Sequence, residues 1–153
     1  MAAEMAEMED IQVEMAFASD DVASAPKEEK EKRRGIAGEF FVYKMAGAAA
    51  NQGFNLSDVA RIARKTNENT CSKGVGLTPC SLPQTGEPSF EIGDNEMEIG
   101  LGHHGEPGIE KAPLESADNV ADQLLKAIFN DMQLNKGEEG WRPPKVRVFS
   151  LCS

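Results

Sequence analysis

The chain's only two histidines are adjacent and lie among glycines in the stretch GLGHHGEPG, residues 100–108. Three chemical interpretations fit His103, His104 and Glu106. The first is a metal site, but adjacent residues on extended backbone point to opposite faces, and no Cys-x-x-Cys or His-x-x-x-His spacing accompanies them. The second is an ordinary surface loop. The third is a histidine presented for chemistry on a small substrate.

The glycines favour the third interpretation on steric grounds, because they remove side-chain bulk around an imidazole. Pro107 fixes the exit of the loop, and Glu106 supplies a carboxylate that can orient a ring. A neutral imidazole nitrogen is a nucleophile toward an electron-poor carbonyl, provided that it stays uncharged at the working pH. We therefore expect no metal here. The residues alone leave the surface-loop and nucleophile interpretations open.

The loop follows a stretch whose alternation predicts a strand at residues 96–102. Loops at strand ends commonly carry chemistry, because the sheet fixes their geometry. The apolar residues of this strand share one face. Glu96 and Glu98 lie on the other, where we expect solvent rather than an acid–base pair.

Strands and an extended segment are expected elsewhere too. Alternating apolar residues predict strands at 11–17 and 145–151. Glycines and prolines between short apolar pieces predict an extended segment with turns at 74–83. The stretch SDDVASAP after the first strand reads as a polar turn.

Apolar residues at three- and four-residue spacing predict helices at 36–53, 56–70 and 116–134. The apolar stripe of the first helix includes Phe40 and Met45. Helices and strands in this order indicate an α/β fold, with a mixed sheet and flanking helices.

The composition excludes several classes of function. The 153 residues carry 26 acidic and 16 basic side chains, a net charge of −10, which argues against nucleic-acid and anionic-membrane partners. The N-terminus has no apolar signal segment, and three widely spaced cysteines indicate reduced thiols in a cytoplasmic protein. The basic cluster Lys30, Lys32, Arg33 and Arg34 is interleaved with glutamates, so we expect a solvated loop.

Residues 74–110, GVGLTPCSLPQTGEPSFEIGDNEMEIGLGHHGEPGIE, resemble the substrate-binding subunit or domain of dihydroxyacetone (glycerone) kinases. Supporting stretches are DDVAS at 20–24, the run from RRGIAGEFF to ARKTNEN at 33–69, and the helix that begins LESADNVADQLL. The resemblance divides the chain into a disordered extension (1–8), a partial substrate-binding domain of this K-type, two-lobed kind (9–139) and a divergent tail (140–153).

The resemblance implies a role for the histidine before Gly-Glu-Pro-Gly, which in this family attacks the substrate ketone and holds dihydroxyacetone as a covalent hemiaminal. By motif match this residue is His104, with Gly102, Gly105 and Glu106 shaping its loop. The preceding residue is usually aliphatic in the family. Here it is His103, which we interpret as incidental.

The resemblance also implies what lies outside the matched stretch. Family members carry, upstream, a glycine-rich loop with a catalytic histidine and an aspartate that acts as base, and the sequence given starts after both. It contains no phosphate-binding loop motif. We therefore expect no cofactor in this chain and impaired kinase activity from it alone. The donor, ATP with Mg²⁺ or a phosphoprotein, belongs to a separate subunit or domain.

The partners implied are dihydroxyacetone or a similar short-chain ketose, a nucleotide-binding kinase subunit or domain, and a second copy of the chain as a homodimer. The alternative is a non-catalytic module that dimerises or docks a kinase subunit through the helix FFVYKMAGAAA at 40–50. Replacing His104 separates these two hypotheses. If His104 binds the ketone, ketone binding is lost in the variant, while partner binding is retained.

Overall fold

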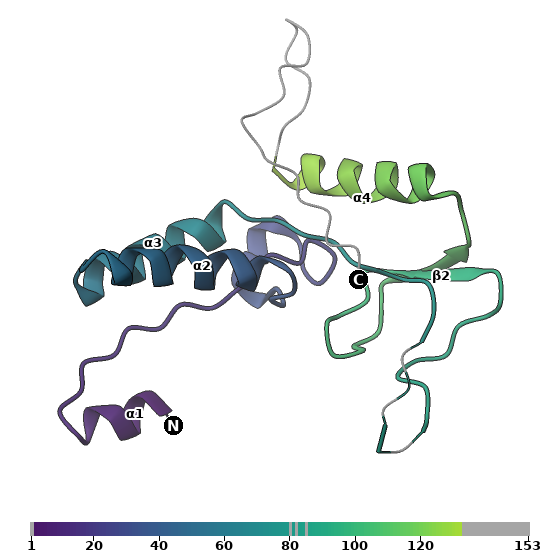
Figure 1. The fold of residues 1–153 in the computed structure, drawn as a ribbon. Coiled ribbons are helices and arrows are strands. Elements are labelled where there is room, and N and C mark those ends of the chain that lie inside the picture. Colours follow the sequence, from purple (N-terminus) through teal and green to yellow (C-terminus); the bar gives the residue numbers. More distant parts are fainter. Residues whose placement is uncertain (1, 80, 82, 85, 133–153) are drawn as a thin grey trace, which may run out of the picture.

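A computed structural model describes residues 2–79, 81, 83–84 and 86–132, and Figure 1 shows how they are arranged. The predicted strand at 145–151 and the tail boundary at 140 lie outside these residues. The elements follow one another as α1 (Ala2–Glu7), a 3-10 helix (Lys27–Lys32), α2 (Gly38–Asn51), α3 (Leu56–Glu68), β1 (Val75–Gly76), β2 (Glu96–Ile99), β3 (Glu110–Pro113) and α4 (Ala117–Asp131). The α/β class expected from the sequence is confirmed.

Helices α2 and α3 pack side by side (Figure 1). Gly53, at a φ of +82°, turns the chain after α2, and the Asn55 side chain then accepts a hydrogen bond from the Asp58 amide, 2.9 Å away. The residues that α2 and α3 bury are mostly small, a composition that lets two backbones approach closely; they are Gly38, Val42, Ala49, Ala60 and Ala63.

The predicted apolar stripe of α2 is wrong in part. Phe40 and Met45 are about half exposed, and Tyr43 is 72% exposed. Spacing identifies residues that share a face, but the alanine side of α2 packs on α3 and leaves the larger side chains outside.

The sheet is antiparallel in the order β1-β2-β3, with Val75 opposite Ile99 and Glu96 opposite Pro113. Parallel pairing occurs, within the described residues, in one isolated bridge, between Asp21 and Ser72. Strand β2 ends earlier than predicted, because Gly100 leaves the strand at a φ of +78°. Strand β3 was not predicted from the sequence.

Glu98 on β2 is buried, so the expectation of a solvated glutamate face fails there. Its Oε1 accepts a hydrogen bond from the Gly108 amide at 2.6 Å. A buried carboxylate needs such donors to offset lost hydration. For Glu98 the donor is the Gly108 amide, which lies at the end of the histidine loop opposite to β2 in the sequence.

The predicted strand at 11–17 is wrong. Its residues belong to no β-ladder, and Ile11, Met15 and Phe17 are more than half exposed. Alternation gives a segment two faces, but a strand also needs a neighbour, and in the described part of the chain none pairs with it. At the N-terminus α1 is a short helix without buried residues, where we expected disorder.

Two carboxylates of the expected polar turn lie instead in the core. Asp20 and Asp21 have no exposed surface. Asp20 accepts hydrogen bonds from the amides of Ile36 (3.3 Å) and Gly38 (2.8 Å), and from the Ser72 hydroxyl. The Asp20 charge therefore faces the positive end of α2, where anions are stabilised.

Arg33 corrects the prediction of a fully solvated basic cluster. Its side chain is 1% exposed and forms two parallel hydrogen bonds with Asp131, Nη1 to Oδ2 at 2.9 Å and Nη2 to Oδ1 at 2.5 Å. Nε donates to the Ala25 carbonyl at 2.8 Å. These bonds from Arg33 lower the pKa of the Asp131 carboxyl and, in return, raise the pKa of Arg33. No residue of α4 is fully buried, and this pair ties the last turn of α4 to Arg33.

We predict that Asp131→Asn lowers the free energy of unfolding by about 3 kcal/mol at pH 7, because it leaves the buried Arg33 charge without its counterion. Urea unfolding followed by circular dichroism measures the loss. The control is Glu29→Ala, which removes an exposed partner of Lys32 and should cost less than about 0.5 kcal/mol.

The difference in the free energy of unfolding between wild type and Asp131→Asn should depend on pH. A lowered folded-state pKa stabilises the protein above the unfolded-state pKa, and this stabilisation is lost as pH falls through the folded-state value. The gap should therefore stay constant from pH 8 to pH 5 and shrink in stronger acid. A gap that grew on acidification would contradict the assignment.

Candidate functional site

The histidine loop joins β2 to β3, and its base is closed by backbone hydrogen bonds. The Gly100 amide donates to the Gly74 carbonyl at 2.8 Å, and the Ile109 amide donates to the Ile99 carbonyl at 2.8 Å. These bonds tie the start and end of the loop to β1 and β2. Residues 101–108 therefore project from a fixed base at the end of the sheet.

Both glycines predicted to shape the loop bear on its conformation. A Cβ on Gly102 would lie 2.3 Å from Glu106 Oε2 and 2.8 Å from Arg34 Nη1, so a side chain there would displace the ends of these two flexible side chains. Gly105 has a φ of +82°, a conformation that side chains disfavour. The Gly102 amide donates to the Glu106 carbonyl at 2.9 Å, and the Gly105 amide to the Gly102 carbonyl at 3.2 Å, so the loop is a closed turn.

His104 lies at the tip of this turn with its side chain 80% exposed. Its ring Nδ1 is 3.4 Å from Glu106 Oε1, and its backbone amide donates to Glu106 Oε2 at 2.9 Å. One carboxylate thus holds both the backbone and the ring of His104. All four residues singled out from the sequence, Gly102, His104, Gly105 and Glu106, meet in this turn.

The electrostatics of the turn favour an ionised glutamate. Hydrogen bonds from the amides of Glu106 itself and of His104, together with the His104 ring, lower the pKa of the Glu106 carboxyl. A carboxylate facing Nδ1 favours the neutral tautomer that carries its hydrogen on Nδ1. In that tautomer Nε2 carries no hydrogen and keeps its lone pair.

His103 contacts His104 edge to face, with ring centroids 4.9 Å apart and planes at 89°. The contact restricts the His104 ring from one side. In the described residues no cluster of three or more histidine, cysteine or acidic side chains is arranged for a metal ion.

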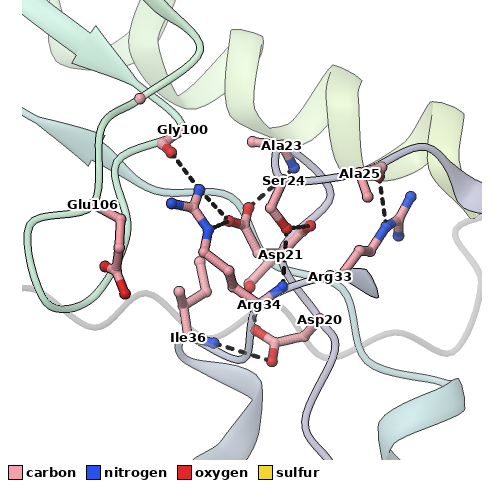
Figure 2. A network of polar contacts seen from close by, with 12 residues as sticks. Asp20, Asp21, Ala23, Ser24, Ala25, Arg33, Arg34, Ile36, Gly100 and Glu106 are labelled. Carbon is pink, nitrogen blue, oxygen red and sulfur yellow. Dashed lines mark hydrogen bonds and ion pairs between the residues drawn. The ribbon is translucent and has the colours of Figure 1, made fainter. Parts of the chain in front are cut away.

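Sequence reasoning missed three residues that support the loop from outside, shown in part in Figure 2. Arg34 donates from Nη2 to the Gly100 carbonyl at 2.9 Å, while Nε and Nη2 contact Asp21 Oδ2 at 3.1 and 2.8 Å. Glu98 binds the Gly108 amide at the other end of the loop. Opposite charges in DD at 20–21 and RR at 33–34 were a signal for such pairing, but local pattern reading assigned both to solvent.

Other features of the described residues lie apart from the loop. A hollow is lined by residues of the 16–18 segment, Gly35 and the first turns of α2, and by none of the histidine loop. Within the part of the chain that the structure describes, no helix is long and apolar enough to cross a bilayer.

Comparison with known proteins matches the chain over residues 1–143 to the family model described as the Dak1 domain. The chain is 46% identical over 139 residues to the dihydroxyacetone-binding subunit DhaK of PTS-dependent dihydroxyacetone kinase 2 from Listeria innocua, covering 91% of this chain and 41% of that protein. It is 43% identical over 130 residues to a 3,4-dihydroxy-2-butanone kinase, named as putative, from Solanum lycopersicum, covering 85% and 22%.

Among solved structures, the native dihydroxyacetone kinase of C. freundii superposes with a TM-score of 0.76 at 34% identity, covering 85% of this chain and 23% of that one. The chain thus spans less than half the length of the relatives described here. The family match covers most of the chain, including the whole histidine loop. On this basis the chain belongs to the Dak1 domain family.

Proposed function

We propose that this chain carries the ketone-binding loop of a dihydroxyacetone kinase, and that His104 binds dihydroxyacetone or a similar short-chain ketose as a covalent hemiaminal. The observation that carries the proposal is the exposed His104 imidazole with its Nδ1 facing an ionised Glu106. Gly102 and Gly105 shape the turn without adding side chains of their own beside the exposed ring.

The chemistry is a reversible addition. The Nε2 lone pair attacks the C2 carbonyl carbon, a new N–C bond forms, and the carbonyl π pair moves to oxygen. The alkoxide takes a proton from water, and the Nδ1 proton leaves toward Glu106 and solvent, so that a neutral hemiaminal results. An ionised Glu106 stabilises the positive charge that develops on the ring during attack.

The substrates named for relatives support a ketone ligand. Besides dihydroxyacetone-binding subunits, they include an L-erythrulose kinase from Pectobacterium atrosepticum and a D-erythrulose kinase from Mycolicibacterium smegmatis. All of these compounds carry a carbonyl beside a hydroxyl group. A polyol such as glycerol has no carbonyl and cannot form the adduct, so selectivity follows from bond formation rather than pocket shape.

Phosphoryl transfer in this proposal requires a partner. The donor is ATP with Mg²⁺ or a phosphoprotein on a separate kinase subunit or domain, and the tether holds the substrate hydroxyl in place for it. The relatives support both donors, since the dihydroxyacetone kinase of C. freundii was solved in complex with AMP-PNP and Mg²⁺ and other relatives are PTS- or PEP-dependent. A cytoplasmic location is part of the proposal and agrees with the free thiol of Cys71.

We predict that His104→Ala abolishes adduct formation, because it removes the ring nitrogen that forms the N–C bond in this proposal. Carbon-13 NMR of dihydroxyacetone labelled at C2 detects the adduct as conversion of a carbonyl carbon to a tetrahedral one. His103→Ala is the matched control and should retain the adduct. Adduct formation that survived His104→Ala but not His103→Ala would transfer the role to His103, and no adduct in wild type would refute the proposal.

We predict that Glu106→Gln weakens ketone binding roughly tenfold, because a charge-assisted contact to the ring is lost. Since the Glu106 pKa is lowered, its titration should leave binding unchanged between pH 6 and pH 8. The dissociation constant from NMR titration measures both effects. Glu110→Gln, on the exposed start of β3, is the control; an equal loss in this variant would rule out a specific role for Glu106.

The exposed side chains of α2 favour a second candidate function, docking of a kinase subunit or of another copy of the chain. Phe40, Tyr43 and Met45 leave apolar surface open on a helix whose other side packs on α3. Exposed apolar residues gathered on one element commonly mark protein contacts.

For this second candidate we predict that Tyr43→Ser weakens self-association roughly tenfold, because buried aromatic residues dominate interfaces. Sedimentation velocity over a concentration series measures the association. Lys65→Ser on the exposed side of α3 is the control. Wild type that stays monomeric throughout the series would exclude the homodimer and leave docking of a kinase subunit.

A further inference from the structure

We propose that Arg34 is a positioning residue for His104, which it orients by fixing the backbone of the histidine loop from the protein core. The effect on ketone binding rests on the proposed function. The effect on the loop itself does not, because it concerns contacts within the free chain.

Arg34 joins the core to the loop through one planar group. Its Nε and Nη2 lie 3.1 and 2.8 Å from Asp21 Oδ2, and the same Nη2 donates to the Gly100 carbonyl at 2.9 Å. The Asp21 side chain is fully buried, whereas Arg34 is 26% exposed. The guanidinium is therefore held at its buried end and directs a donor toward the loop, a geometry that the rigid fork of arginine permits.

Asp21 is itself fixed, so it can serve as the anchor. Its Oδ1 accepts a hydrogen bond from the Ala23 amide at 3.0 Å, and its own amide donates to the Arg34 carbonyl at 3.1 Å. Backbone and side-chain contacts thus join residues 21 and 34 twice. The Arg34 side chain starts from a fixed backbone position and ends on a fixed carboxylate.

The carbonyl that Arg34 binds lies where β2 turns into the loop. Gly100 has a φ of +78°, and a Cβ there would lie 2.8 Å from the Ala23 side chain. Glycine tolerates many peptide orientations, so an external donor is needed to select one. Arg34 supplies this donor, and its Nη1 also lies 2.8 Å from where a Gly102 Cβ would be.

The other end of the loop has a separate anchor, so the Arg34 contact acts on the entry to the loop. Glu98 Oε1 binds the Gly108 amide at 2.6 Å, and Glu98 belongs to β2. Glu106 closes the turn between the two ends. Without Arg34, the amides of Gly100, Gly102 and Gly108 keep their acceptors, but the Gly100 carbonyl loses its side-chain donor.

The test compares Arg34→Gln and Arg34→Lys with wild type and with the control Arg61→Gln, which alters an exposed arginine of α3 paired with Asp58. Amide hydrogen exchange of Gly102 without ketone reports the loop, and exchange of Ala63, buried in α3, reports the fold. Arg34→Lys keeps the countercharge of Asp21 and guards against misfolding of the glutamine variant.

We expect Arg34→Gln to raise Gly102 exchange roughly tenfold more than it raises Ala63 exchange, which reports the loss of the Asp21 counterion, and to weaken dihydroxyacetone binding roughly tenfold. Arg34→Lys should restore part of the protection of Gly102 from exchange and part of the ketone binding. The recovery is incomplete because a single ammonium cannot contact Asp21 and Gly100 with the arginine geometry. Arg61→Gln should match wild type.

Unchanged Gly102 exchange in both Arg34 variants overturns the proposal. Equal acceleration at Gly102 and Ala63 in both variants also overturns it, since Arg34 would then stabilise the whole fold. If Gly102 exchange rises more than Ala63 exchange but wild type binds no ketone, the positioning of the loop stands and the proposed function fails.

Discussion

The fold depends on two adjacent carboxylates, those of Asp20 and Asp21, whose side chains are completely buried. Burying ionised groups is costly unless hydrogen bonds and opposite charges replace the lost hydration. Asp20 finds its replacement in the first turn of α2, and Asp21 finds it in Arg34. Among the described residues, every buried side-chain nitrogen or oxygen has a hydrogen-bond partner. The helix pair and the sheet are therefore joined by polar contacts rather than by a large apolar core.

The same pair of carboxylates links structure to the candidate chemistry. Asp20 orients the helical part of the molecule, while one residue later Asp21 orients Arg34 and, through Gly100, the loop that carries His104 (Figure 2). A nucleophilic ring must approach a carbonyl along a narrow range of directions. The glycines of the loop give its backbone conformational freedom, and the contacts from Arg34 and Glu98 restrict that freedom.

Local patterns predicted those parts whose causes are local. Helix α3 and the glycine turn around His104, both expected from the sequence, depend on residues a few positions apart. Arg33 and Arg34 could not be placed in this way. The partner of Arg33, Asp131, lies 98 positions away, and that of Arg34 in the loop, Gly100, lies 66 away. A charged residue looks solvated in any short window, and only the tertiary partner reveals that it is buried. The segment 11–17 failed for the converse reason, since its pattern lacked a neighbouring strand.

The Arg33–Asp131 pair has a consequence for how the chain acquires its shape during synthesis. Contacts between distant residues require closure of a long loop and form late, whereas helix α2 and the adjacent α3 can associate early. Arg33 leaves the ribosome well before Asp131 of α4. The Arg33 guanidinium therefore stays hydrated until Asp131 has been translated. This contact of α4 therefore forms only after the 98 residues from Arg33 to Asp131 have been added.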